Sequence, residues 1–173
     1  AAIEGSLRLG GMISVRLLVY IIGGLSLVYY INSLGGGFVM DDAIVIIDNQ
    51  YTLKGISGWP GIFENDTFYG FFREVGKDHL VAGGRYRPLS LALFALEGQI
   101  FGFKPIVFHF FNILYFALTC MLLFNLMRQL LNPRFDKNSV LIISFFTALI
   151  FTIHPIHTEV VANIKGRDEI LCC

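Results

Sequence analysis

The sequence predicts an all-α polytopic membrane protein. Hydrophobic residues make up 55% of the 173-residue chain and charged residues only 15%, whereas soluble domains carry about 25% charged residues. The formal net charge is zero, which gives no support for nucleic acid as a partner. The three cysteines have no spacing typical of a metal site or a disulfide framework. Membrane lipids are therefore the first surroundings to expect.

Three apolar segments are predicted to span the membrane, at about residues 13–34, 105–131 and 139–154. A helix needs about 20 apolar residues to cross the hydrocarbon core, and the third segment is short by this measure. Three glycines end the first segment, and Asn132-Pro133 ends the second. Another span is predicted to start near residue 167. The chain is thus expected to be a fragment of a larger membrane protein.

A long loop, about residues 35–104, follows the first span. Pro88–Phe103 within it is apolar but carries Glu97 and is shorter than a span, so we interpret it as an interfacial helix. Loops of this length are usually functional or disordered, and Trp59 with several phenylalanines favours order. This interpretation puts five basic residues on one face, which the positive-inside rule makes cytoplasmic: Arg8, Arg16, Arg128, Arg134 and Lys137. The N-terminus is then cytoplasmic and the loop external.

Two polar clusters follow predicted spans on that external face. Asp41-Asp42 stands seven residues after Leu34, and His154-Pro155-Ile156-His157-Thr158-Glu159 ends the third span. Ionisable groups at membrane exits are costly to keep unless they are solvated, paired or used. Because the clusters end different spans, they predict one polar site on one side of the bilayer.

Several of these residues have more than one interpretation. Neighbouring carboxylates raise each other's pKa, and such a group can act as general base or bind a divalent ion; Asp41-Asp42 can also be a solvated loop start. Arg85 and Arg87 precede an apolar helix, where they can bind a phosphate or extend to lipid headgroups. The loop surface is predicted to include Glu64, Asn65-Asp66-Thr67 and Asp78-His79.

The second cluster and the charges after it are also open to two interpretations. His154 and His157 have an H-x-x-H spacing, but no cysteine and no HExxH pattern accompanies it, so no metal site is predicted. The histidines can instead donate to a phosphate or a sugar hydroxyl. Charged residues near the start of a predicted span indicate a functional site. Here these residues are Lys165, Arg167, Asp168 and Glu169. The alternative is an internal pair of Arg167 with a glutamate that only holds helices together.

Six short motifs follow one another along the chain in an order that is typical of one protein family. They are Asp41-Asp42, Asp66-Thr67-Phe68-Tyr69-Gly70, Tyr86-Arg87-Pro88-Leu89, Phe108-His109 with Asn112, His154-Pro155-x-His157-Thr158-Glu159, and Gly166-Arg167-x-Glu169. Each motif is weak alone, but their shared order is specific. From about Gly37 to Leu171 the chain resembles the N-terminal membrane part of the transmembrane O-mannosyltransferases with tetratricopeptide repeats, in the GT-C glycosyltransferase superfamily.

The resemblance implies a GT-C-like N-terminal part with three spans, the start of a fourth and a long external first loop containing interfacial helices. It also implies an inverting membrane glycosyltransferase. The donor would be a polyprenyl-phosphate-linked sugar, expected to be mannose, and the acceptors Ser and Thr hydroxyls of proteins on the luminal or periplasmic face. The membrane would be that of the endoplasmic reticulum in a eukaryote or the inner membrane in a bacterium. The need for a divalent metal stays open.

The resemblance also implies roles for single residues. Asp41 or Asp42 would be catalytic, with Asp42 favoured as the general base. Four residues would contact the donor phosphate and its sugar: Arg87, His154, His157 and Arg167. Glu159 would orient a histidine or bind a sugar hydroxyl. A fragment of this length is expected to lack part of the donor pocket.

A non-enzymatic interpretation stays open beside this one. A transporter, or a membrane scaffold or binding subunit, could use the same external polar cluster. Transporters place ionisable groups near the membrane midplane on broken helices, whereas the charges here lie at span ends. Their position favours chemistry on a lipid-linked substrate at the interface.

Overall fold

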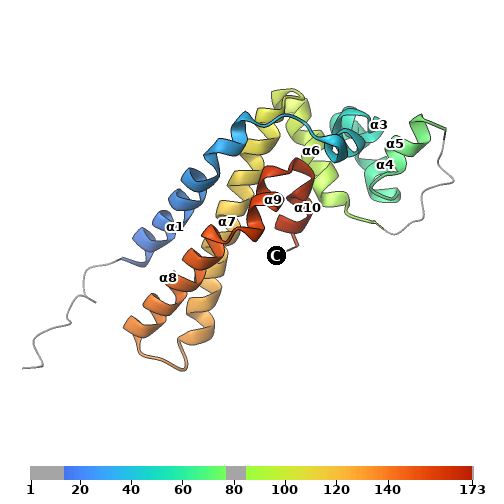
Figure 1. Cartoon of the computed structure of the whole chain (residues 1–173). Coiled ribbons are helices and arrows are strands. Elements are labelled where there is room, and N and C mark those ends of the chain that lie inside the picture. The colour runs from blue at the N-terminus through green and yellow to red at the C-terminus, as the bar shows by residue number, and fades with distance from the viewer. Residues whose placement is uncertain (1–13, 77–84, 173) are drawn as a thin grey trace, which may run out of the picture. The chain divides into compact units, whose positions relative to one another are not determined.

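The computed structural model describes residues 14–76 and 85–172, and the regular structure within these ranges is helical (Figure 1). These residues form two compact units, which are considered separately. The first unit contains residues 14–29 and 116–155, and the second contains residues 30–115 and 156–172. The long helix α7 (Pro105–Leu131) contributes to both. The prediction of an all-α membrane protein is confirmed.

The first unit consists of α1 (Val15–Tyr30), the second half of α7, and α8 (Lys137–Ile153), which lie side by side in Figure 1. Two stretches are long and apolar enough to cross a membrane: Val15–Gly35, which joins α1 to the 3₁₀ helix η2 (Ile31–Gly35), and α7. α8 passes the same test only together with α9 (Ile156–Ala162). These helices cover the three predicted spans.

Close packing holds the helices of the first unit together. The Met121 side chain of α7 packs against Gly23 of α1, where a Cβ atom would lie 2.0 Å from Met121 Cε. The Tyr29 hydroxyl donates to the Ile153 carbonyl at 3.4 Å, and the rings of Phe116 and Phe151 stack with centroids 5.9 Å apart. These contacts join α8 to both of the other helices.

The second unit begins with a series of short helices. They are α2 (Met40–Asp42), the π-helical η3 (Ala43–Ile47), α3 (Gln50–Leu53), η4 (Gly55–Gly58), α4 (Trp59–Glu64) and α5 (Tyr69–Glu74). α6 (Pro88–Phe101) follows, with proline in its first turn, where the missing N–H is not needed, and Gly102 at φ 85° after its end. The predicted first loop is therefore an ordered helical layer where it is described.

A hydrophobic core joins this layer to α6 and α7. Its buried residues are Val45, Ile46, Ile62, Leu91, Phe94, Ala95, Phe108 and Ile164. Two polar contacts fix the layer further: Trp59 Nε1 donates to the Ala92 carbonyl at 3.2 Å, and Ile56 N donates to Gln99 Oε1 at 2.8 Å. α6 is 14 residues long and apolar, which fits the interpretation that it does not span. Which side of the membrane it faces stays a prediction.

The loop-surface prediction is wrong for one residue. Thr67 is only 7% exposed, because the segment that carries Arg87 packs against it and Arg87 N donates to its hydroxyl. Asp78 and His79 lie outside the described residues. The chain after α9 forms the 3₁₀ helix η6 (Ile164–Gly166) and α10 (Arg167–Ile170). A further span starting near residue 167 stays a prediction.

Candidate active site

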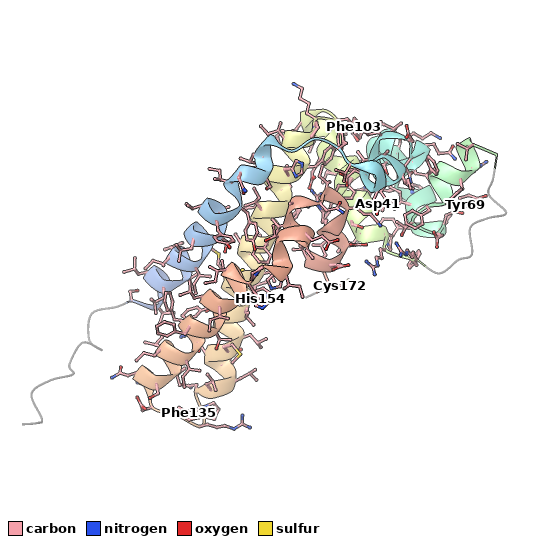
Figure 2. All side chains as sticks on the ribbon, viewed as in Figure 1. Asp41, Tyr69, Phe103, Phe135, His154 and Cys172 are labelled. Atoms are coloured by element: carbon pink, nitrogen blue, oxygen red, sulfur yellow. The ribbon has the colours of Figure 1, made fainter. Side chains whose placement is uncertain are left out.

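An open cleft of about 360 Å³ lies in the second unit. Figure 2 shows Asp41 close to the C-terminal helices, and α2 contacts η6. The cleft is lined by Asp41, Arg85, Arg87, Ile156, Glu159, Val160, Asn163, Lys165, Gly166, Asp168 and Glu169. The structure thus brings together three of the residues predicted for the site, Asp41, Arg87 and Glu159, from separate parts of the sequence.

Hydrogen bonds to Asp66 and Thr67 hold the arginine segment at the cleft. Asp66 Oδ2 accepts from Arg85 N at 2.9 Å, and the Arg85 carbonyl accepts from Thr67 N at 2.9 Å. Thr67 Oγ1 accepts from Arg87 N at 3.0 Å. The sequence analysis gave Asp66 and Thr67 no role. They position Arg85 and Arg87.

Arg87 forms an ion pair with Asp168 on the cleft. The Arg87 side chain is 42% exposed, so its guanidinium remains accessible to a ligand. The hydrogen bond with Asp168 raises the pKa of Arg87 further above its ordinary value, which keeps it cationic at every relevant pH. A half-exposed guanidinium can exchange a carboxylate for a phosphate, because both accept paired N–H donors.

Asp41 and Lys165 form the second ion pair of the cleft. Lys165 Nζ lies 2.9 Å from Asp41 Oδ2, and the Asp41 side chain is 52% exposed. Lys165 Nζ also lies 5.7 Å from the centre of the Phe68 ring, and the Arg85 guanidinium lies over the same ring at 5.5 Å. The cleft therefore presents an accessible carboxylate beside three cations.

Asp42 is adjacent in sequence but has different surroundings. Its side chain is fully buried, Oδ1 accepts from Lys165 N at 2.9 Å, and Oδ2 accepts from Val39 N at 3.0 Å. Burial raises the pKa of Asp42, although these two hydrogen bonds oppose the shift. Asp42 does not line the cleft. Asp41 is therefore accessible from the cleft, whereas Asp42 holds the loop against η6.

Gly166 is required by the close approach of η6 to α9. A Cβ atom there would lie 2.3 Å from the Val160 carbonyl oxygen, a distance that no side chain can occupy without backbone movement. Asn163 begins the turn, with its Oδ1 accepting from Lys165 N at 3.1 Å. Together they set the positions of Lys165 and Asp168 at the cleft.

Arg167 lies in the core rather than at the cleft. Its side chain is fully buried, with Nη1 donating to Glu97 Oε2 at 2.6 Å, Nε to Asn112 Oδ1 at 2.8 Å, and Nη2 to the Phe108 carbonyl at 3.0 Å. Its guanidinium is 4.2 Å from the centre of the Phe94 ring. The geometry therefore favours the internal pair, which was the alternative interpretation of Arg167. Direct contact with the donor would require this cluster to open.

Glu97 completes the buried pair. Its Oε1 accepts from the Tyr115 hydroxyl at 3.1 Å, so both carboxylate oxygens have a donor. Burial raises the pKa of Glu97, whereas the charge of Arg167 and the hydrogen bonds from Arg167 and Tyr115 lower it. Burial likewise lowers the pKa of Arg167. The sequence analysis noted Glu97 only as a charge in an apolar helix, 70 residues from its partner.

The two histidines are not part of the cleft lining. His157 is half-buried on α9, the helix that carries Glu159. His154 is exposed and belongs to the first unit. Among the described residues, no group of three or more His, Cys, Asp and Glu side chains is arranged to hold a metal ion.

The chain has named relatives. It is 37% identical to protein O-mannosyl-transferase TMTC1 of Homo sapiens over 153 residues (88% of this chain, 16% of the relative). It is 35% identical to TMTC3 of Mus musculus over 142 residues (82% and 14%), and 37% identical to Tmtc2 of Drosophila melanogaster over 150 residues (86% and 15%).

These matches cover most of this chain but only 14–16% of each relative. No family model matches the chain, and no solved structure matches it. The relatives carry the name of the family that the six motifs resemble. The chain belongs to the transmembrane protein O-mannosyl-transferase family.

Proposed function

We propose that this chain forms the cleft of a membrane glycosyltransferase that moves mannose from a polyprenyl-phosphate carrier to Ser and Thr hydroxyls of proteins. The names of the relatives support the transferred sugar and the protein acceptor. The lipid-linked donor, inversion and an external active site are parts of the proposal. Its main support is that Asp41 and Arg87 line one cleft, although they lie in different segments.

The proposed reaction is a single displacement at the anomeric carbon. The acceptor hydroxyl oxygen forms a bond to that carbon while the bond to the phosphate oxygen breaks, which inverts the configuration. Asp41 takes the hydroxyl proton, because its carboxylate is accessible in the cleft. The leaving lipid phosphate carries the released negative charge and needs cations beside it.

Arg85 and Arg87 are proposed to bind that phosphate. Both line the cleft, and their backbone is fixed by Asp66 and Thr67. Asp168 holds Arg87 in place until the phosphate arrives. The phosphate can then replace the carboxylate, because the Arg87 guanidinium is 42% exposed on the cleft. Glu159 is proposed to accept a hydrogen bond from a sugar hydroxyl. Arg167 positions the turn that carries Lys165 and Asp168.

The proposal is tested by sugar transfer in the natural protein reconstituted in membranes. The donor is radiolabelled polyprenyl-phosphate mannose, the acceptors are Ser- and Thr-containing peptides, and Asp41→Asn is compared with the wild type. Loss of the proton acceptor is expected to lower kcat by roughly 10²–10⁴, with donor binding retained. Asp42→Asn tests the other carboxylate in the same assay.

The matched control is Glu64→Gln, since Glu64 is an exposed acid of the same unit away from the cleft. Its turnover is expected to equal that of the wild type. Wild-type turnover in Asp41→Asn would exclude Asp41 as the base. No transfer from a mannose or glucose carrier by folded wild-type protein would favour the transporter or binding interpretations.

A further inference from the structure

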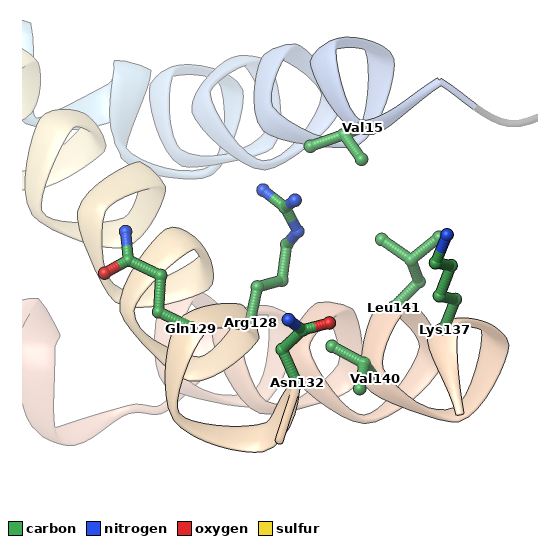
Figure 3. Close-up of a pocket in the computed structure, with 7 residues that line it drawn as sticks. All are labelled: Val15, Arg128, Gln129, Asn132, Lys137, Val140 and Leu141. Carbon is green, nitrogen blue, oxygen red and sulfur yellow. The ribbon is translucent and has the colours of Figure 1, made fainter. Parts of the chain in front are cut away.

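A second cleft, of about 290 Å³, lies in the first unit between α1, α7 and α8 (Figure 3). Its polar lining consists of Arg128, Gln129, Asn132 and Lys137. Its apolar lining consists of Val15, Val140 and Leu141. In Figure 3 the Arg128 guanidinium extends into the space between α7 and α1. This cleft has no part in the proposed reaction.

The positive charge of this cleft is not balanced by its lining. Among the described residues, no acidic side chain lines the cleft, and neither Arg128 nor Lys137 forms an ion pair. Arg128 donates to Asn125 Oδ1 at 3.1 Å and lies 5.7 Å from the centre of the Phe124 ring. These neutral contacts orient the guanidinium without neutralising its charge. An anion in the cleft would therefore meet two cations.

The nearest acid in the sequence is already engaged. Asp136 precedes α8, where its Oδ2 accepts from the backbone N–H groups of Asn138 and Ser139 at 3.1 Å each. Its Oδ1 accepts from the Ser139 hydroxyl at 2.6 Å. These bonds lower the pKa of Asp136, so it stays ionised as the cap of α8. It does not line the cleft and leaves Lys137 available.

The surroundings of the cleft indicate the ligand. α1 and α7 are long and apolar enough to cross a membrane, and large side chains such as Leu122 and Ile150 are exposed on the helices of this unit. Basic pockets between transmembrane helices bind the phosphate groups of acidic lipids. Gln129 and Asn132 add amide donors for phosphate oxygens. The three apolar lining residues can contact the upper part of an acyl chain.

We propose that this cleft binds the phosphate headgroup of an anionic membrane phospholipid, with Arg128 and Lys137 as the charged contacts. The shared chemistry is a phosphate anion, which a lipid or the solution can supply. Simple extension of lysine and arginine to headgroups requires only charge near the surface. A specific binding site requires Arg128 and Lys137 in particular. The two explanations therefore predict different results when these residues are replaced. The proposal does not depend on the proposed transfer reaction.

The test uses native mass spectrometry of the natural protein in detergent, titrated with dioleoyl phosphatidylserine or dioleoyl phosphatidylcholine. The variant Arg128→Gln/Lys137→Gln is compared with Arg16→Gln/Arg134→Gln. The control removes the same charge from exposed positions that do not line the cleft. The wild type and the control are expected to prefer phosphatidylserine. The cleft variant is expected to lose about tenfold in affinity for it.

The outcomes separate the possibilities. Equal losses in the two double variants would show general charge attraction and overturn the proposal, as would equal binding of the two lipids by the wild type. Inorganic phosphate at millimolar concentration is added in a further titration. Binding of phosphatidylserine that survives this competitor identifies the lipid as ligand, whereas displacement together with phosphate binding by the wild type would contradict the lipid assignment. Thermal unfolding midpoints equal to the wild type exclude misfolding as the cause.

Discussion

Two ion pairs on the cleft and one in the core, all among the described residues, have sharply different surroundings. Arg87–Asp168 and Lys165–Asp41 lie on the open cleft, where Arg87 and Asp41 are 42% and 52% exposed and their partners Asp168 and Lys165 are 13% and 19% exposed. Arg167–Glu97 is enclosed, with exposures of 0% and 4%. Exposed pairs contribute about 0–1 kcal/mol, whereas breaking a buried pair costs about 3–5 kcal/mol. The cleft pairs can therefore exchange partners with a ligand, and the buried pair serves to hold the structure.

The cleft and the core are connected through one short segment. Lys165 and Asp168 line the cleft, and Arg167 between them enters the core. The acceptors around Arg167 come from α6 and α7. The buried pair thus fixes the backbone from which two cleft residues project. We expect the buried pair to affect the cleft through the position of these residues rather than through contact.

The largest expected effect is on stability and comes from Glu97→Ala. This change leaves the buried Arg167 without its charged partner, which is expected to lower the free energy of unfolding by about 3–5 kcal/mol. The measurement is the thermal unfolding midpoint of the natural protein in detergent. The control is Ile100→Ala on the same helix, where the side chain is 61% exposed. Equal midpoints for the two variants would show that removing the buried partner of Arg167 costs no more than truncating an exposed side chain.

A second variant sharpens this comparison. Replacing both partners, as Glu97→Met/Arg167→Met, leaves no charge without a partner in the core. Because apolar replacement of a buried pair is often neutral or stabilising, the double variant is expected to be more stable than Glu97→Ala. An additive loss in the double variant would show that each side chain stabilises the core on its own.

Arg87→Gln is expected to act on donor binding. Because Arg87 lies on the cleft and is half-exposed, its loss is expected to raise the KM for the lipid-linked donor about tenfold. Stability is expected to change little. The measurement is the initial rate of transfer against donor concentration, with Lys54→Gln as an exposed cation away from the cleft. An unchanged KM would remove Arg87 from the donor site.

The smallest expected effect is the pH dependence due to Asp42. Because burial raises the pKa of Asp42 above 3.8, the folded state holds its proton to higher pH than the unfolded state. Stability therefore falls as the pH rises from 3.8 through the folded-state pKa. Asp42→Asn removes this titration. The unfolding midpoint of the variant minus that of the wild type is expected to rise across this range. A difference independent of pH would contradict the shift.

The sequence predicted the long helices well because their signal is local. A stretch without charge and of sufficient length needs no partner to be recognised, and α1 and α7 follow such stretches. α6 was recognisable as a short apolar helix between Pro88 and Gly102. The helices α2 to α5 were not placed individually, because their positions depend on a core with residues from distant segments, such as Phe108 and Ile164.

The site was predicted less completely for a related reason. Successive residues of a helix project about 100° apart, so Asp41 and Asp42 at α2 enter different surroundings, one exposed and one buried. The sequence shows two adjacent acids and cannot separate them. The pairing of Arg167 with Glu97 could not be predicted from the sequence either, since the two residues are 70 positions apart. Motifs identified Arg87 and Glu159 directly, and both line the cleft.

The central claim is that Asp41 acts in turnover while Glu97 acts in stability. We would measure mannose transfer and the unfolding midpoint on the same preparations of Asp41→Asn and Glu97→Ala. Asp41→Asn is expected to lose at least about 100-fold in kcat with its midpoint within about 2 °C of the wild type. Glu97→Ala is expected to lose roughly 10 °C in midpoint. Wild-type turnover in Asp41→Asn, or a wild-type midpoint in Glu97→Ala, would contradict the account.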